Sequence, residues 1–148
     1  MGLGMLAGGA IVALLLAGLL DQSTAATSLR AGDCLLDPGV EQVVDVARVD
    51  CAAPHEFEVI GNVTLSGAAY PGDAEVVADA RAACEPVFAS YVGDPYEDSP
   101  WFINVLTPTA ETWADGERSA TCLVFQFGED LGVRRVTGSA AEAGRSGT

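Results

Sequence analysis

The sequence has 148 residues, with 21 acidic side chains against 7 basic ones and a formal net charge of −14 at pH 7. Such a chain repels phosphate backbones, so nucleic acid is excluded as an expected partner. All 7 basic residues are arginine, and without lysine no Schiff base, Ser-Lys dyad or phosphate-loop lysine can form. Because there is also only one histidine, we predict no catalytic residue and no cofactor.

The chain opens with an apolar segment. The 18 residues from Leu3 to Leu20 carry no charged side chain, and as a helix they would span about 27 Å, close to the thickness of the hydrocarbon core. We expect residues 1–20 to be a transmembrane anchor. A secretory signal and a buried core helix are the alternatives. An anchor or a signal would place everything after Asp21 on the extracytoplasmic side, and an anchor would make the protein single-pass in the plasma membrane.

Strand patterns recur along the remainder of the chain. Runs of branched and aromatic residues, several with period-2 alternation, predict these strands. In the second of them, alternation puts Glu56 and Glu58 on a polar outer face, with His55 away from both. The predicted strands cover residues 40–49, 57–64, 101–107 and 119–127, with a short fifth candidate at 133–136.

Two helices are predicted between these strands. The longer follows the Tyr70-Pro-Gly-Asp73 turn, with Asp73 as its cap and Pro86 as the site of a kink or restart. The shorter begins after Thr109 and stops at Gly116. The longer helix is expected to bury one stripe, made of Val77, Ala80, Cys84, Val87, Phe88 and Tyr91.

The order of these elements predicts an α+β fold behind the N-terminal transmembrane helix. The expected domain covers residues 29–136 and is a small, largely antiparallel sheet with one main helix, a short second helix and two disulfides. Small polar residues make 21–28 an expected linker, and composition makes 137–148 an expected disordered tail.

Four cysteines, Cys34, Cys51, Cys84 and Cys122, allow three disulfide connectivities. Pairing neighbours is favoured, because Cys34–Cys51 would close a local loop and Cys84–Cys122 would clamp the main helix to the last strand. A zinc site would require close cysteine pairs and a redox site a C-x-x-C motif, and neither spacing is present, so we predict no metal site. Structural disulfides in an oxidising compartment are the preferred interpretation.

Two further groups of residues are candidates for binding or structure. Pro54 and His55 follow the second cysteine, and we favour a structural turn, in which the ring bonds a nearby carbonyl, over a general base or metal ligand. The loop after the main helix lacks a calcium-binding pattern and is expected to be solvated, although an exposed tryptophan beside it would be able to grip a sugar ring. These candidate ligand-binding residues are Asp94, Glu97, Asp98, Trp101 and Trp113.

Several short motifs together resemble the actinobacterial septum-formation domain family. The resemblance implies an exported domain behind a membrane or lipid anchor, with a role in the cell envelope connected to division or wall growth. The motifs are Gly32-Asp-Cys34, Val49-x-Cys51-x-x-Pro-His55-x-x-Glu58-Val59, Tyr70-Pro-Gly-Asp73, Cys84-x-Pro86-x-Phe88-x-x-Tyr91-Val92 and Pro108-Thr-x-x-x-Trp113-x-x-Gly116-x-Arg118-x-x-x-Cys122.

These observations predict a non-enzymatic envelope domain that binds other membrane or wall proteins, as an accessory subunit of a membrane complex. Residues 3–20 would supply the contact with the plasma membrane. A module that binds wall glycan or a small ligand is the alternative, and it would use the two tryptophans and the acidic loop.

Overall fold

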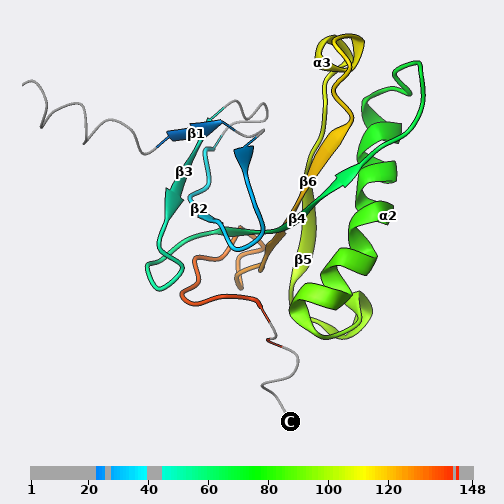
Figure 1. Cartoon of the computed structure of the whole chain (residues 1–148). Coiled ribbons are helices and arrows are strands. Elements are labelled where there is room, and N and C mark those ends of the chain that lie inside the picture. Colours follow the sequence, from blue (N-terminus) through cyan, green and yellow to red (C-terminus); the bar gives the residue numbers. More distant parts are fainter. Residues whose placement is uncertain (1–22, 26–27, 40–44, 142, 144–148) are drawn as a thin grey trace, which may run out of the picture.

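The computed structural model describes residues 23–25, 28–39, 45–141 and 143, and these form an antiparallel sheet with one main helix (Figure 1). The strand order is β1-β3-β2-β4-β6-β5, and every described pairing is antiparallel. The α+β class is therefore confirmed for this part of the chain. The strands are β1 (Ser23–Ala25), β2 (Cys34–Leu35), β3 (Asp45–Val49), β4 (Phe57–Thr64), β5 (Phe102–Leu106) and β6 (Ser119–Phe125).

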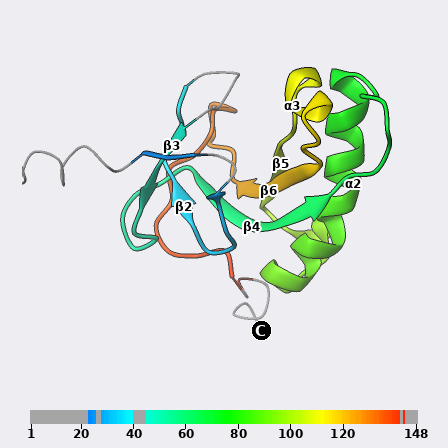
Figure 2. The ribbon, with the colours of Figure 1, turned by 45° about the horizontal axis from the view of Figure 1, so that its top comes forward.

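The helices gather at one end of the sheet. The main helix α2 (Asp73–Val92) runs beside β4, β5 and β6, while β1, β2 and β3 lie at the opposite end, away from it (Figures 1 and 2). A single turn of 3-10 helix, η2 (Tyr96–Asp98), follows α2. The short helix α3 (Ala110–Ala114) begins at Thr109, whose side chain accepts a hydrogen bond from the Thr112 amide, so the predicted cap is confirmed.

Helix α2 differs from its prediction in three details. It continues through Pro86 without a break. Gly72, not Asp73, is the N-cap, and Asp73 instead accepts a hydrogen bond from the Tyr70 hydroxyl at 2.6 Å. The buried stripe is shifted, because packing against the sheet selects a different set of positions and leaves Val77 39% exposed. The buried residues of α2 are Val76, Ala80, Cys84, Phe88 and Val92.

Both disulfides pair cysteines that are neighbours in the sequence. Cys34 is bonded to Cys51 beside β2, and Cys84 of α2 is bonded to Cys122 of β6. The favoured connectivity is therefore the one present. The second bond lies in the core between α2 and the sheet, together with Phe88.

Strand β4 contributes side chains to two hydrophobic cores, one between the sheet and α2 and one near β2. Its register shifts between Val59 and Gly61, and such a bulge changes which face the side chains take. Val59 packs beside Leu35 in the core near β2, whereas Ile60 packs on the α2 side. Gly61 lies so close to α2 that a Cβ there would be 2.9 Å from Val87 Cγ1.

The expected polar outer face of β4 is wrong for Glu56 and Glu58, although Asn62 and Thr64 farther along the strand are exposed. Both Glu56 and Glu58 are buried, and so is His55. The alternating pattern is real, but a second layer covers the polar side: α2 supplies Tyr91, and the C-terminal segment supplies Ser139 and Ala140.

The predicted boundaries also need correction. Residues 23–25, within the expected linker, form β1 against β3. The expected disordered tail is wrong for residues 137–141, because Ala140 is fully buried and the Gly138 amide donates to the Cys51 carbonyl at 2.6 Å. Residues 133–136 make isolated bridges instead of a strand, and residues 40–44 lie outside the described part.

The predicted anchor at residues 1–20 also lies outside the described residues. A helix with the length and apolar character needed to cross a membrane is not found within the described part of the chain.

Candidate functional site

Both candidate tryptophans are buried. Trp101 packs in the core between α2 and the sheet, and Trp113 packs in a further hydrophobic cluster under the start of that helix. The Trp113 Nε1 donates to the Ala68 carbonyl at 3.3 Å, and the Arg118 guanidinium carbon lies 3.9 Å from the centroid of the Trp113 ring. One face of Trp113 and its N–H are therefore taken by protein atoms, and Trp101 is also buried, so the alternative of an exposed tryptophan that grips a sugar ring is wrong.

The acidic loop stays apart from the Trp113 core. Glu97 and Asp98 are exposed on η2 and Asp94 is half-buried. No hydrogen bond or ion pair within the described part of the chain joins these three side chains to either tryptophan. The structure therefore does not combine the predicted ligand-binding residues into one site.

The turn at Pro54 and His55 is built around the histidine. Its Nδ1 lies 2.8 Å from the Ala53 carbonyl oxygen, and its backbone amide and carbonyl both pair with Val136. This is the ring-to-carbonyl bond that the structural interpretation expects. The buried Nε2 has no hydrogen-bond partner among the described residues. A general base needs a path to substrate, and full burial of this ring removes that path.

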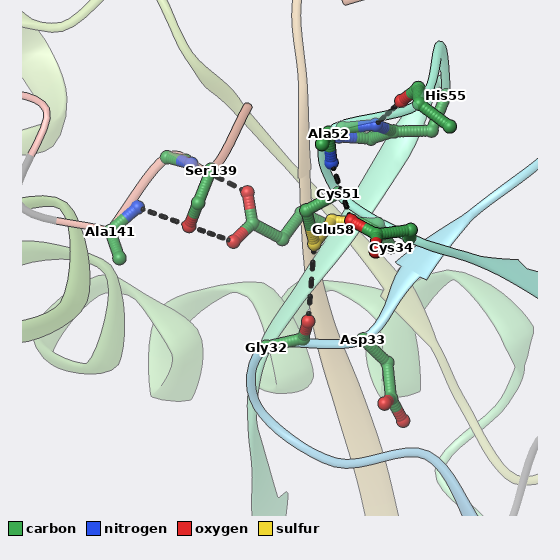
Figure 3. Close-up of a disulfide and its surroundings, with 12 residues drawn as sticks. Gly32, Asp33, Cys34, Cys51, Ala52, His55, Glu58, Ser139 and Ala141 are labelled. Carbon is green, nitrogen blue, oxygen red and sulfur yellow. Dashed lines mark hydrogen bonds between the residues drawn. A yellow bond between two sulfur atoms is a disulfide. The ribbon is translucent and has the colours of Figure 1, made fainter. Parts of the chain in front are cut away.

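Glu58 is the centre of a buried polar cluster (Figure 3). The side chain is 0% exposed, and one carboxyl oxygen accepts from the Tyr91 hydroxyl at 2.7 Å and from the Ser139 hydroxyl. The other accepts from the Ala140 amide at 2.6 Å. A buried carboxylate is tolerated only when donors satisfy it, and these three come from α2 and the C-terminal segment. The cluster therefore acts as a structural junction.

The pKa of Tyr91 is raised to about 12, chiefly because burial disfavours the phenolate. The hydrogen bond that the phenol donates to the Glu58 carboxyl raises this pKa further. One Glu58 oxygen also lies within 4.8 Å of both sulfurs of Cys34–Cys51. Those sulfurs are bonded to each other and offer no thiolate, so this cluster supplies a single carboxyl ligand, fewer than a zinc site needs.

Glu56 holds the C-terminal segment at a second point. Its carboxylate pairs with the Arg135 Nε at 2.7 Å and accepts from the Asp37 amide at 3.0 Å. Burial alone would raise the pKa of Glu56, but these two hydrogen bonds and the charges of Arg135 and His55 outweigh it, and the pKa is lowered. The sequence shows Glu56 and Arg135 as ordinary surface charges, because their partnership spans 79 positions.

One exposed feature has no structural role of this kind. Phe102, Phe125 and Phe127 lie in mutual contact, with ring centroids 4.7 to 5.9 Å apart. Phe102 is 38% exposed and Phe127 is 44% exposed. Val133 lies opposite Phe127 in an antiparallel bridge, which puts its exposed side chain on the same face. We call these four residues the aromatic patch. Sequence reasoning missed it, because an alternating aromatic run is also typical of a buried strand.

A turn beside the aromatic patch presents a fifth apolar side chain. Leu131 is 79% exposed and has a φ of 62°, the only positive φ of a non-glycine residue in the described part. The turn is closed by the Gly128 amide, which donates to the Gly132 carbonyl at 2.8 Å. A bulky residue in this conformation is strained, and such strain is commonly kept where function needs the side chain.

The family model described as septum formation matches residues 31–148, which is most of the chain. The chain belongs to the septum formation family. The match starts just before β2 and extends beyond the C-terminal segment that Glu58 holds. This family is not a known enzyme family.

Two relatives of this septum formation domain come from Mycobacterium tuberculosis. An uncharacterized membrane protein is 33% identical over 100 residues, which is 64% of this chain and 22% of the relative. The putative lipoprotein LppN is 32% identical over 103 residues, which is 67% of this chain and 56% of the relative. The matched region therefore spans only about a fifth to just over half of these relatives. No solved structure matches the chain.

Proposed function

We propose that this septum formation domain is a non-enzymatic, extracytoplasmic domain of the cell envelope, held at the plasma membrane by residues 3–20. In this role it binds other membrane or wall proteins, as an accessory subunit of a complex linked to division or wall growth. The family description supports the connection to division. The names of the relatives, a membrane protein and a lipoprotein, support a place in the envelope.

The observation that carries the binding role is the aromatic patch. Exposed, contiguous apolar surfaces on soluble domains commonly mark sites of protein interaction, and aromatic side chains are enriched at the centres of interfaces. Phe102 and Phe127 are large, rigid groups that would bury much apolar area at little conformational cost. The partner is therefore expected to present an apolar surface of its own.

The cysteines, His55 and Glu58 support a non-enzymatic role, because each of them is used structurally. All four cysteines are in disulfides. His55 is buried with its Nδ1 at a carbonyl oxygen, and the Glu58 carboxyl is occupied by three donors. Using any of them for chemistry would first require the fold to open.

The decisive experiment is purification of the tagged full-length chain from native membranes in neutral detergent. A Phe127→Ser variant is compared with wild type and with Val77→Ser, a matched control because Val77 is similarly exposed at 39% but lies on α2. We expect a reproducible set of membrane proteins with wild type and Val77→Ser and its loss with Phe127→Ser. Circular dichroism checks that all three are folded. Equal recovery with all three folded proteins would refute the role of the patch.

A further inference from the structure

A groove of about 560 Å³ lies where the C-terminal segment crosses the end of the sheet. It exists because residues 133–136 run from Phe127 to His55, making one bridge at each end. The Arg134 amide donates to the Gln126 carbonyl at 2.8 Å and fixes the segment between those bridges. The lining residues are Pro54, Trp101, Gln126, Arg134, Arg135, Val136 and Thr137.

The groove is basic in a strongly acidic chain. No acidic side chain is among its lining residues, although the net charge of the protein is −14. Arg135 uses its Nε for Glu56 and makes no described hydrogen bond with its two terminal nitrogens. Arg134 makes no ion pair with any described residue, and its contact with the Gln126 side chain is long, at 3.5 Å. The Arg134 guanidinium and the two terminal nitrogens of Arg135 can therefore both donate hydrogen bonds to a ligand in this groove.

Two other arginines in the described part, Arg48 and Arg118, are already engaged. Arg48 pairs with Asp33 at 3.3 Å. Arg118 donates to the Trp113 and Glu117 carbonyls while its guanidinium lies over the Trp113 ring. Arg134 differs from both, because the only hydrogen bond of its side chain among the described residues is the long one to the Gln126 amide oxygen.

We propose that this groove binds the carboxylate of a short peptide segment. A guanidinium presents paired N–H groups that match the two oxygens of a carboxylate. Trp101, Pro54 and Val136 give the walls apolar character suited to small aliphatic side chains and peptide planes. A long phosphate polymer would meet the repulsion of the whole acidic surface, whereas one carboxylate on an otherwise neutral peptide largely escapes it. The carboxylate belongs either to a peptide C-terminus or to an aspartate or glutamate side chain.

The groove and the aromatic patch are separate surfaces. Along each strand, successive side chains point to opposite faces, so Trp101 and Gln126 face away from Phe102 and Phe127. Binding of a carboxylate therefore does not depend on the protein partner proposed above, and either proposal can fail alone.

The test uses the full chain in neutral detergent micelles and three probes: N-acetyl-Ala-Ala with a free C-terminus, its C-terminal amide, and N-acetyl-Ala-Glu amide. Binding is followed by the indole N–H resonance of Trp101. We expect the neutral amide to leave this resonance unchanged. A response to the first probe assigns the carboxylate to a peptide C-terminus, and a response to the third assigns it to a side chain. Binding should weaken as salt is added.

Variants decide whether Arg134 is responsible. Arg134→Gln should weaken binding at least tenfold, while Arg81→Gln, which removes the same charge from an exposed position of α2, should not. No response to either carboxylate probe would overturn the proposal. Equal binding by folded Arg134→Gln, or inorganic phosphate binding as tightly as the peptides, would overturn it as well.

Discussion

One oxygen of Glu58 accepts a hydrogen bond from the Ala140 amide at 2.6 Å, joining two residues 82 positions apart. This contact fixes the C-terminal segment over β4 and beneath the end of α2, where Tyr91 donates to the same carboxyl group. The segment in turn forms one wall of the groove. A single buried side chain thus holds both residues 139–140 and, through them, one wall of a candidate binding surface.

Glu58→Ala should destabilise the domain strongly. The substitution leaves the buried Ala140 amide without its acceptor and also removes the acceptor of the Tyr91 and Ser139 hydroxyls. An unsatisfied buried group costs about 1–3 kcal/mol, so the free energy of unfolding should fall by about 3 kcal/mol or more. Urea unfolding measures this. The isosteric Glu58→Gln, which keeps one acceptor oxygen for the amide, should cost less than Glu58→Ala, and an equal loss would contradict the hydrogen-bond explanation.

Deleting the chain from Ser139 onward should expose protected parts of β4. The deletion removes the fully buried Ala140 and two donors to Glu58. Amide hydrogen exchange around Glu58 should then speed up markedly relative to the intact chain. The control stops the chain after Ala143 and retains both donors. Exchange that is unchanged by the longer deletion would show that the segment is dispensable.

Removing the Cys84–Cys122 disulfide should cost somewhat more stability than removing Cys34–Cys51. The sequence separations are 38 and 17, for which chain entropy gives about 4 and about 3 kcal/mol. The Cys84–Cys122 bond also joins α2 to β6 within the core. Double alanine variants compared by urea unfolding without reductant measure both values. A larger fall in the free energy of unfolding on removal of Cys34–Cys51 than on removal of Cys84–Cys122 would contradict this prediction.

Stability should decline at high pH because of Tyr91. Its pKa in the folded protein is about 12, above the ordinary value of 10.0, so the folded state holds the proton more tightly than the unfolded state. The resulting stabilisation is complete below pH 10 and is lost as the pH rises through 12. Tyr91→Phe should flatten this part of the stability profile. An unchanged slope in folded Tyr91→Phe would show that another group causes the loss.

Leu131→Gly should make the domain more stable while weakening partner binding. Glycine adopts a φ of 62° without steric cost, and relief of the strain should add up to about 1 kcal/mol to the free energy of unfolding. The same change removes an apolar side chain that is 79% exposed next to the aromatic patch. Thermal unfolding and recovery of membrane partners measure the two effects. A loss of stability would show that Leu131 packs as part of the fold.

The sequence alone determined the local features of this protein. Alternation identified β4, runs of branched and aromatic residues identified β3, β5 and β6, Thr109 identified the start of α3, and the order of elements gave the α+β class. Each of these depends on residues a few positions apart, where periodicity and capping act directly on the backbone. The favoured cysteine pairing belongs here too, because it joins neighbouring cysteines in the chain order.

Only the tertiary structure decided what the polar residues do. Glu56 and Glu58 have the pattern of a solvated face, and they are buried because α2 and the C-terminal segment cover that face. The groove and the aromatic patch likewise join residues from β5, the end of β6 and the segment after it. Contacts over such separations depend on how the whole chain closes on itself, and no local spacing encodes them.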